Sequence, residues 1–322
     1  RWHRPIERLL RNENPEALRQ TIRAVAVLET DVFTDRLAEL AADTGLPGAV
    51  RVSALDALSK GGSDLSTETF DVLLDMIDHG GPTDAEEAAR MVSSSRLTVD
   101  QLAALADSLT EAGPSALRDL IRPYGRSLPP AVAESLLSAL ERARSLERVP
   151  TNEVSDVIKR FPTEMLPRAN ALLDRLKNND QQRIAMIDQL IPMVEKASHQ
   201  RGREVFYSLQ AACSSCHRVG EQGGTIGPDL TTIGMNRSKQ DLIESILFPS
   251  ASIVRQYESH IVLTTEGQVY SGMIVGETAD DLQIQLQKGD PITISRSDIK
   301  QSSPSSVSIM PTGLAKLLTT QQ

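Results

Sequence analysis

Two cysteines three positions apart, followed directly by a histidine, form the segment Cys213-Ser214-Ser215-Cys216-His217. On a helical turn, residues at i and i+3 project from one face. The thiols of Cys213 and Cys216 can therefore add to the two vinyl groups on one edge of a porphyrin, while the imidazole of His217 ligates the iron from below the ring. This spacing is the attachment sequence for haem c, and we predict one covalent haem c with His217 as its proximal ligand.

Two other kinds of site use the same cysteine spacing. A C-x-x-C pair can form a redox disulfide, which needs no following histidine and usually occurs in a βαβ context. It can also supply half of a zinc site, but Zn²⁺ binds four ligands and the sequence has no second Cys/His cluster. The chain contains only these two cysteines, so neither has a competing partner elsewhere. Haem c is the favoured interpretation.

Length and composition describe a globular chain of 322 residues that we expect to form two domains. Aromatic residues make up only 3%, while Ala and Leu abound, which favours helix-on-helix packing over an all-β core. The net charge is −9 and no basic stripe is present, so nucleic acid is not an expected partner. An acidic surface suits docking to a basic redox partner.

No run of about 18 apolar residues occurs, so no transmembrane segment is expected in this sequence. The chain begins Arg1-Trp2-His3-Arg4-Pro5, without an initiator Met or the apolar stretch of a signal peptide. We interpret it as a fragment or processed form of a longer protein. Because covalent haem c is assembled outside the cytoplasmic membrane, the predicted chemistry indicates a periplasmic or other extracytoplasmic location.

The first 199 residues show a repeating pattern. Prolines recur at intervals of 32, 35, 32 and 36 residues, and each precedes an amphipathic run: Pro15, Pro47, Pro82, Pro114 and Pro150. Each interval holds two such runs, which predicts an α-solenoid with two helices per repeat. The pattern resembles HEAT-type repeats, and an irregular helical bundle is the alternative. More helix is expected between Thr151 and His199.

The predicted array contains no recognisable catalytic group. His3 and His79 are isolated, and Glu86-Glu87 is expected on a solvated helix face. Thr98 and Gln101 have the spacing of a capping box at the start of a helix. We expect the array to act as a spacer or docking surface.

Residues around the cysteine motif have a specific layout. Gly202 and Phe206 precede it on a predicted helix, and Gly227-Pro228 with Leu230 follow it in a Gly-rich loop. This layout resembles class I cytochromes c. The resemblance implies that the Gly/aromatic pair lies where the first helix crosses the last and that Pro228 packs beside His217. It also implies that a nearby backbone carbonyl fixes the imidazole, and that Phe206, Pro228 and Leu230 contact the haem.

A further segment, at about 253–299, interrupts this layout with alternating polar and apolar residues. Strands are expected at 259–265, 268–275, 282–286 and 292–294, forming a small antiparallel insertion. The predicted fold class is mainly α. It comprises a HEAT-like α-solenoid (1–199) followed by an α-helical cytochrome c domain (200–322) that carries the insertion and ends in a short helix through Leu317 and Leu318.

Helical repeats followed by such a domain resemble the Planctomycetes-type haem-binding C-terminal region of large membrane-associated dehydrogenase-like proteins. The resemblance implies a redox partner protein, either a dehydrogenase or another cytochrome.

The second axial ligand of the iron is predicted to be Met310. A Met-Pro pair in a loop before the last helix is what the cytochrome c resemblance implies, and Pro311 would stiffen that loop. Met235 and Met273 are alternatives, although Met273 lies in a predicted strand and is expected to pack there. His260 would give bis-histidine ligation, but a lone strand histidine is more often a surface residue. An open sixth position is a further alternative.

Apolar residues from several segments are candidate walls of the haem pocket: Val205, Phe206, Leu209, Ile226, Leu230, Ile246, Leu314 and Leu317. Three functions follow from this assignment. The favoured one is an electron-transfer module; the others are a haem enzyme of peroxidase or gas-binding type with an open distal site, and a solenoid scaffold with a structural or sensory haem. The sequence identifies no catalytic residue, so an electron-transfer unit is favoured over a self-contained catalyst.

Overall fold

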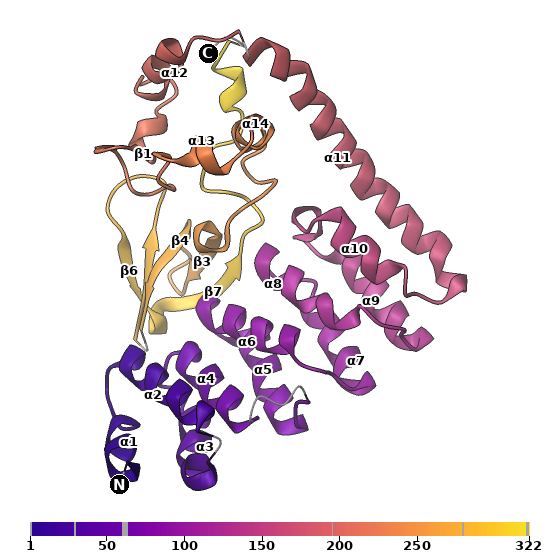
Figure 1. Ribbon diagram of the computed structural model, residues 1–322, viewed down its shortest axis with the longest axis vertical. Helices are drawn as coiled ribbons and strands as arrows, with labels where there is room; N and C mark the ends of the chain where they lie inside the picture. The colour runs from indigo at the N-terminus through magenta and orange to yellow at the C-terminus, as the bar shows by residue number, and fades with distance from the viewer. Residues whose placement is uncertain (1, 29, 60–63, 195, 279, 320–321) are drawn as a thin grey trace.

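The computed structural model describes residues 2–28, 30–59, 64–194, 196–278, 280–319 and 322. The described chain is mainly helical and includes a small antiparallel sheet, as the sequence predicts (Figure 1). An array of helices occupies the lower part of Figure 1, and one long helix rises from its end to the segment that contains the cysteines. The sheet lies between that segment and the array.

The array consists of ten α-helices among the described residues. They are α1 (His3–Leu9), α2 (Pro15–Val27), α3 (Thr34–Ala42), α4 (Gly48–Leu58), α5 (Thr67–His79), α6 (Pro82–Ser94), α7 (Val99–Ser108), α8 (Pro114–Leu120), α9 (Pro130–Arg142) and α10 (Thr151–Ile158). Short 3₁₀ turns connect some of them: η1 (Asp31–Phe33), η2 (Arg122–Tyr124), η3 (Leu146–Arg148) and η4 (Thr163–Met165).

The five repeating prolines mark the even-numbered helices from α2 to α10. Pro15, Pro82 and Pro114 are the first residues of α2, α6 and α8. Pro47 and Pro150 directly precede α4 and α10. Proline suits the first turn because an N–H there has no partner within the helix. The predicted capping box at the start of α7 is also confirmed, with both of its hydrogen bonds present.

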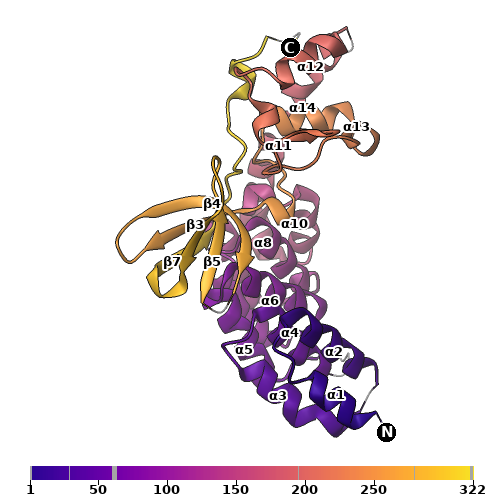
Figure 2. The same ribbon diagram turned by 90° about the vertical axis from the view of Figure 1, so that its left-hand side faces the viewer.

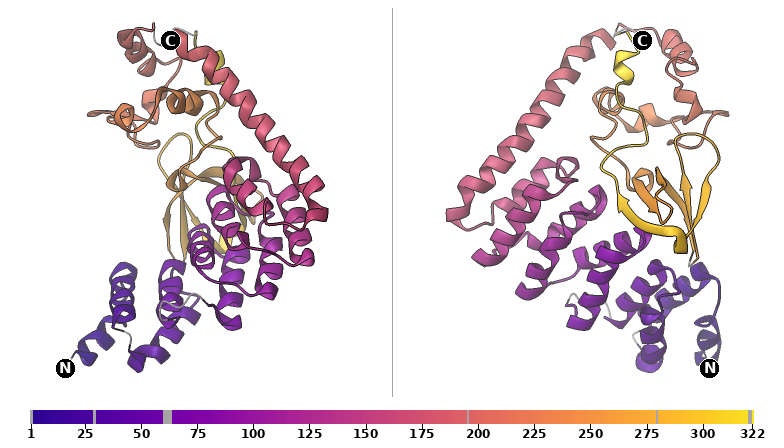
Figure 3. Two further views of the ribbon diagram at one scale, coloured as in Figure 1. Left: turned by 45° about the vertical axis from the view of Figure 1, so that its right-hand side comes forward. Right: turned by 180° about the vertical axis from the view of Figure 1, so that it is seen from behind.

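The helices pack in two rows over a shared core. Helices α2, α4, α6 and α8 follow one another in one row, and α5, α7 and α9 do so in the other (Figures 2 and 3). One continuous apolar core extends from Leu10 to Leu176. Leu102, Leu105 and Leu109 lie fully within it, and burial of such a side chain contributes about 1.5–3 kcal/mol.

The long helix α11 (Leu166–Val194) forms a strut between the array and the cysteine segment, residues 199–250 (Figure 1). Its first half buries Leu172, Leu173 and Leu176 in the core of the array. Its second half leaves the array, and Arg183 there lies 3.5 Å from Glu244 of the cysteine segment. The helix therefore joins the two parts by packing at both ends.

The sheet has five antiparallel strands in the order β6-β5-β4-β3-β7. Its strands are β3 (Ser259–Thr264), β4 (Val269–Glu277), β5 (Asp281–Gln285), β6 (Ile292–Ser295) and β7 (Ile299–Pro304), with η7 (Arg296–Asp298) before the last. Alternate residues point to one face, where Val262, Leu282, Ile284 and Ile294 form a separate small core. The predicted strands are confirmed.

The predicted C-terminal limit of the β-structure, at about 299, is wrong. Strand β7 extends to Pro304 and pairs with β3 at the edge of the sheet. Its sequence, Ile-Lys-Gln-Ser-Ser-Pro, has no alternating pattern, and none of its residues is fully buried. Because this strand lacks the alternation that marks the other four, sequence periodicity does not reveal it.

The cysteine segment consists of short elements joined by loops. They are α12 (His199–Phe206), η5 (Cys213–Ser215), β1 (Arg218–Val219), β2 (Gln222–Gly223), α13 (Ile233–Asn236) and α14 (Lys239–Leu247). Ser238 and Asp241 form a capping box at the start of α14, which confirms the predicted cap. After the sheet, the expected final helix through Leu317 and Leu318 is only a 3₁₀ turn, η8 (Leu314–Lys316).

The prediction of a solvated face at Glu86-Glu87 is wrong, because the connection into the sheet covers this part of α6. Both side chains are half-buried. Glu86 lies 3.5 Å from Arg255 in η6 (Arg255–Tyr257), and Arg255 also bonds Asp119 of α8 at 2.5 Å. Burial raises the pKa of Glu86 to about 7.

None of the helices described is both long enough and apolar enough to cross a bilayer.

Candidate haem attachment site

The two cysteines are presented on a tight turn between α12 and the loop that follows. Ala212 enters this turn in the left-handed backbone region, with φ of 50°. A non-glycine residue there costs about 1–2 kcal/mol. The N–H groups of Cys216 and His217 both donate to the carbonyl of Cys213, at 3.2 and 2.9 Å. One turn of helix thus carries both thiols and the imidazole.

Both cysteines are free thiols and half-buried. Burial raises the pKa of the Cys213 thiol above its ordinary value. A redox-active cysteine in a C-x-x-C pair usually has a lowered pKa, so this environment does not favour the disulfide alternative. A zinc site would need further ligands, and the described residues include no group of three or more His, Cys, Asp or Glu side chains that could hold a metal ion.

Within the described part of the chain, one hydrogen bond fixes the imidazole of His217. Its Nδ1 lies 2.9 Å from the carbonyl oxygen of Pro228. A carbonyl can only accept, so Nδ1 carries the proton and donates it. The lone pair is then on Nε2, the ring nitrogen that a metal ligand needs.

Gly227 holds the loop close against that ring. Its N–H donates to the carbonyl of Cys216 at 2.7 Å. A Cβ atom at Gly227 would lie 2.6 Å from Cε1 and 2.8 Å from Nδ1 of His217, so only glycine fits beside the imidazole. The Gly227-Pro228 pair therefore sets both the position and the tautomer of His217.

The apolar side chains near the motif are not packed into a protein core. None of the eight candidate wall residues is buried, and Leu209 is 99% exposed. Of the apolar side chains described between His199 and Leu247, Ala211 alone is buried. The array and the sheet, in contrast, each bury their apolar faces. Side chains of this kind around a C-x-x-C-H turn fit a large flat apolar group such as a porphyrin.

The predicted crossing of helices at Gly202 is not seen. A Cβ atom at Gly202 would meet nothing within 4 Å, so no other element among the described residues packs against this side of α12. Phe206, at the end of α12, is half-buried and its ring packs edge-on against Tyr207, with centroids 5.0 Å apart. Leu230 is half-buried too, and its N–H donates to the carbonyl of Arg218 at 2.8 Å.

Met310 lies on a segment that is tied to the cysteine segment at both ends. The N–H of Ser308 donates to Oγ of Ser250 at 3.0 Å. Beyond Met310, the turn η8 packs on α14, and the carbonyl of Leu317 accepts from Nε2 of Gln210 at 2.6 Å, three residues before Cys213. Met310 itself is half-buried. No hydrogen bond among the described residues joins this segment directly to His217.

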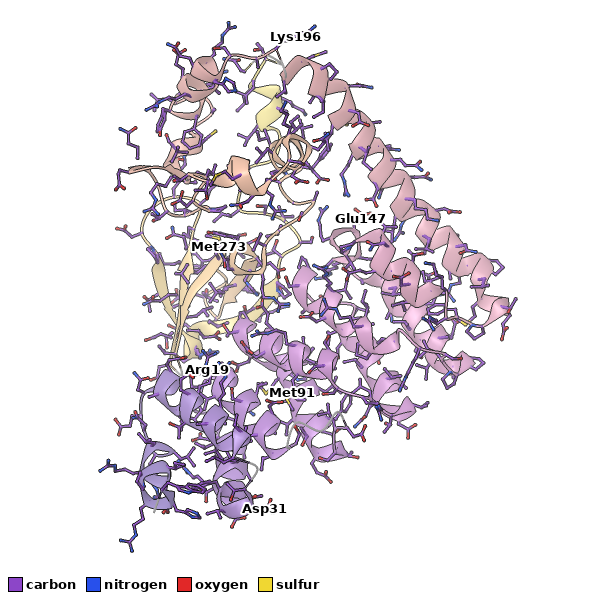
Figure 4. All side chains as sticks on the ribbon, in the orientation of Figure 1. Arg19, Asp31, Met91, Glu147, Lys196 and Met273 are labelled. Carbon is purple, nitrogen blue, oxygen red and sulfur yellow. The ribbon has the colours of Figure 1, made fainter. Side chains whose placement is uncertain are left out.

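The other candidate ligands lie elsewhere. Met273 is 4% exposed and packs in the sheet, as predicted (Figure 4). Met235, on α13, is 80% exposed. His260 is wrongly predicted as a surface residue, because it is 7% exposed and burial lowers its pKa to about 4. Its Nδ1 has no hydrogen-bond partner among the described residues. It lies on the interior strand β3, where it is paired with Gly272 of β4 and Pro304 of β7.

Sequence reasoning missed the polar contacts behind His217. Arg218 forms an ion pair with Asp229, and Asp229 also accepts hydrogen bonds from Thr231. The only signal for them is the position of the two charged residues, each directly after a residue of the predicted site, His217 or Pro228.

A comparison with protein-family models finds no match for this chain, and no curated protein matches it either.

Proposed function

We propose that this chain is a c-type cytochrome unit that holds one haem, bound covalently by Cys213 and Cys216, and transfers single electrons to and from a partner protein. The observation that carries the proposal is the hydrogen bond from Nδ1 of His217 to the carbonyl of Pro228, with Gly227 against the ring. This bond leaves Nε2 available to iron on the same turn that presents both thiols.

The haem, when bound, supplies a one-electron couple between ferric and ferrous iron. The protein's own contribution is positional. His217 ligates through Nε2 and keeps its proton on Nδ1, and Met310 is the proposed second ligand. The apolar side chains of Phe206 and Leu230 limit access of water, which helps to set the potential.

The remainder of the chain would position this unit. We infer that the two rows of helices form an α-solenoid of HEAT type, supported by the proline period that marks every second helix. The resemblance to the Planctomycetes-type haem-binding region suggests a dehydrogenase or another cytochrome as redox partner. Covalent attachment of haem c implies an extracytoplasmic location.

The test is expression of the chain behind a secretion signal, together with a haem c maturation system. Wild-type protein should retain haem after denaturation, and its pyridine haemochrome spectrum should be that of haem c. The double variant Cys213→Ala/Cys216→Ala should lose covalent haem, whereas the control Ser214→Ala, within the same turn, should keep it. Wild-type protein without covalent haem would overturn the proposal.

Binding of carbon monoxide distinguishes an electron-transfer unit from a catalyst with an open iron site. Reduced wild-type protein should bind it slowly or not at all at neutral pH, because two protein ligands occupy the axial positions. Rapid binding would instead favour the enzyme or gas-binding alternative.

A further inference from the structure

A closed set of hydrogen bonds lies directly behind the His217–Pro228 pair. Arg218 follows His217 in the chain, and Asp229 follows Pro228. Nε and Nη2 of Arg218 donate to Oδ2 of Asp229 at 3.0 and 2.6 Å. The other carboxylate oxygen, Oδ1, accepts from the N–H of Thr231 at 2.8 Å and from its hydroxyl. Both oxygens of the carboxylate are therefore occupied.

The same set of hydrogen bonds includes the start of the hairpin formed by β1 and β2. The N–H of Gly220 donates to Oγ1 of Thr231 at 2.8 Å, and the N–H of Leu230 donates to the carbonyl of Arg218 at 2.8 Å. Residues 218–220 and 229–231 thus run side by side, joined by backbone and side-chain bonds. Pro228 is the residue at which this double segment meets the imidazole.

The position of these residues matters more than their contribution to stability. The side chains of Arg218 and Asp229 are 45% and 42% exposed, and exposed ion pairs add about 0–1 kcal/mol to folding. Any displacement of Asp229, however, is transmitted through one peptide unit to the carbonyl that orients His217. A hydrogen bond to the far nitrogen of a histidine ligand fixes its orientation and raises its basicity.

We propose that Arg218, Asp229 and Thr231 are positioning residues for His217, and that they tune the reduction potential of the bound haem. This proposal rests on the proposed function. A more basic imidazole stabilises ferric iron, so the intact set lowers the potential. Loosening it should weaken the bond to Pro228 and raise the potential.

The test compares the midpoint potentials of three variants with that of wild type. Thr231→Val removes hydrogen bonds without a change of charge. Asp229→Asn removes a negative charge, and Arg218→Gln removes a positive one. A purely electrostatic effect would leave the potential of the first variant unchanged, raise that of the second and lower that of the third. Loss of positioning should raise the potential in Thr231→Val and in Asp229→Asn. In Arg218→Gln it should reduce or reverse the electrostatic decrease.

Matched controls lie in the same loop. Thr225→Val and Glu221→Gln make the same chemical changes at exposed side chains that form none of the hydrogen bonds described for this loop. Each should shift the potential less than Thr231→Val and Asp229→Asn respectively. An independent readout is the exchange rate of the His217 Nδ1 proton in NMR spectra, which should increase in the three variants and not in the controls.

The outcomes separate the two proposals. Wild-type protein that attaches no haem overturns the proposed function. Protein that attaches haem, but whose Thr231→Val and Thr225→Val variants have equal potentials and equal proton exchange, keeps that function and overturns the positioning role.

Discussion

The carboxylate of Glu258 accepts a hydrogen bond at 2.9 Å from the backbone N–H of Ser115, across 143 positions of sequence. Ser115 is the second residue of α8, and the N-cap position of that helix, Gly113, supplies no side-chain bond. Glu277, at the end of β4, bonds the N–H of Thr83 in the same way at the start of α6. Two glutamates, one directly before β3 and one at the end of β4, therefore accept hydrogen bonds from the first turns of two helices in the array.

The first N–H groups of a helix have no acceptor within the helix, and the side chain of its own N-cap residue often supplies one. Here the acceptors come from the two glutamates, so these bonds attach the sheet to the array. Because α6 and α8 are neighbours in one row, the two contacts resist both sliding and rotation. The sheet in turn carries the C-terminal segment with Met310, so the array, the sheet and the candidate haem site are held in one arrangement.

Replacement of Glu258 should destabilise the protein. Glu258→Ala removes the acceptor for the N–H of Ser115 at the start of α8, and loss of an N-cap costs about 1–2 kcal/mol. The measurement is the free energy of unfolding from urea titration. Glu266→Ala, at an exposed turn between β3 and β4, is the control and should change it by less than about 0.5 kcal/mol. Equal values for the two variants would show that the contact to Ser115 does not stabilise the fold.

Glu86 should make stability depend on pH. Its ordinary pKa is 4.5, and in the folded protein burial raises it to about 7 against the opposing effect of Arg255. Between these values the unfolded chain releases a proton that the folded chain retains, so stability decreases as pH rises through this window and not beyond it. Each pKa unit corresponds to about 1.4 kcal/mol.

The variant Glu86→Gln should therefore lose less stability than wild type between about pH 4.5 and about pH 7. The difference should be on the order of 3 kcal/mol. Urea midpoints measured across the window provide the test, with Asp78→Asn, an exposed carboxylate on α5, as control. Parallel curves for wild type and Glu86→Gln would contradict the assignment.

How much of this structure is predictable from sequence depends on the range of the interactions. Helix starts follow from local signals, namely the prolines and the Thr98 capping box, so they are predicted well. Contacts made only on folding are not predicted: the sequence does not indicate that Arg255 lies beside Glu86, or that His260 is buried on the interior strand β3. Strand β7 is missed because its own sequence, Ile-Lys-Gln-Ser-Ser-Pro, has no alternating pattern.

In the candidate site, too, local features are predictable from the sequence and contacts between separate segments are not. The C-x-x-C-H spacing identifies the thiols and His217 because all three lie on one turn. The carbonyl of Pro228 is predictable only through the resemblance to class I cytochromes c, since 11 positions separate it from His217. The ion pair of Arg218 and Asp229 cannot be predicted from the sequence, because neither residue type differs from other surface charges.

The close approach of Gly227 to His217 should make this position intolerant of any side chain. Gly227→Ala would place a methyl group 2.6 Å from Cε1 of the imidazole, so the ring or the loop must move and the bond to Pro228 should be lost. We expect incomplete haem attachment and heterogeneous axial ligation, measured by haem content and by electron paramagnetic resonance of the ferric form. Gly234→Ala is the matched control, since a Cβ atom there meets nothing within 4 Å; a variant at Gly227 that matched it in both measurements would argue against a constrained proximal side.

Met310 is tested by removal of its thioether. Reduced Met310→Ala protein should bind carbon monoxide rapidly, and the weak charge-transfer band of Met-ligated ferric iron should disappear from the red end of the spectrum. Wild type and Met235→Ala, whose side chain is largely exposed, should both retain the band and bind carbon monoxide slowly. If Met310→Ala keeps the wild-type spectrum, another side chain ligates the iron. His260 could be that ligand only if it left its buried position on β3. A His260→Phe variant with the wild-type spectrum would exclude His260 as the ligand.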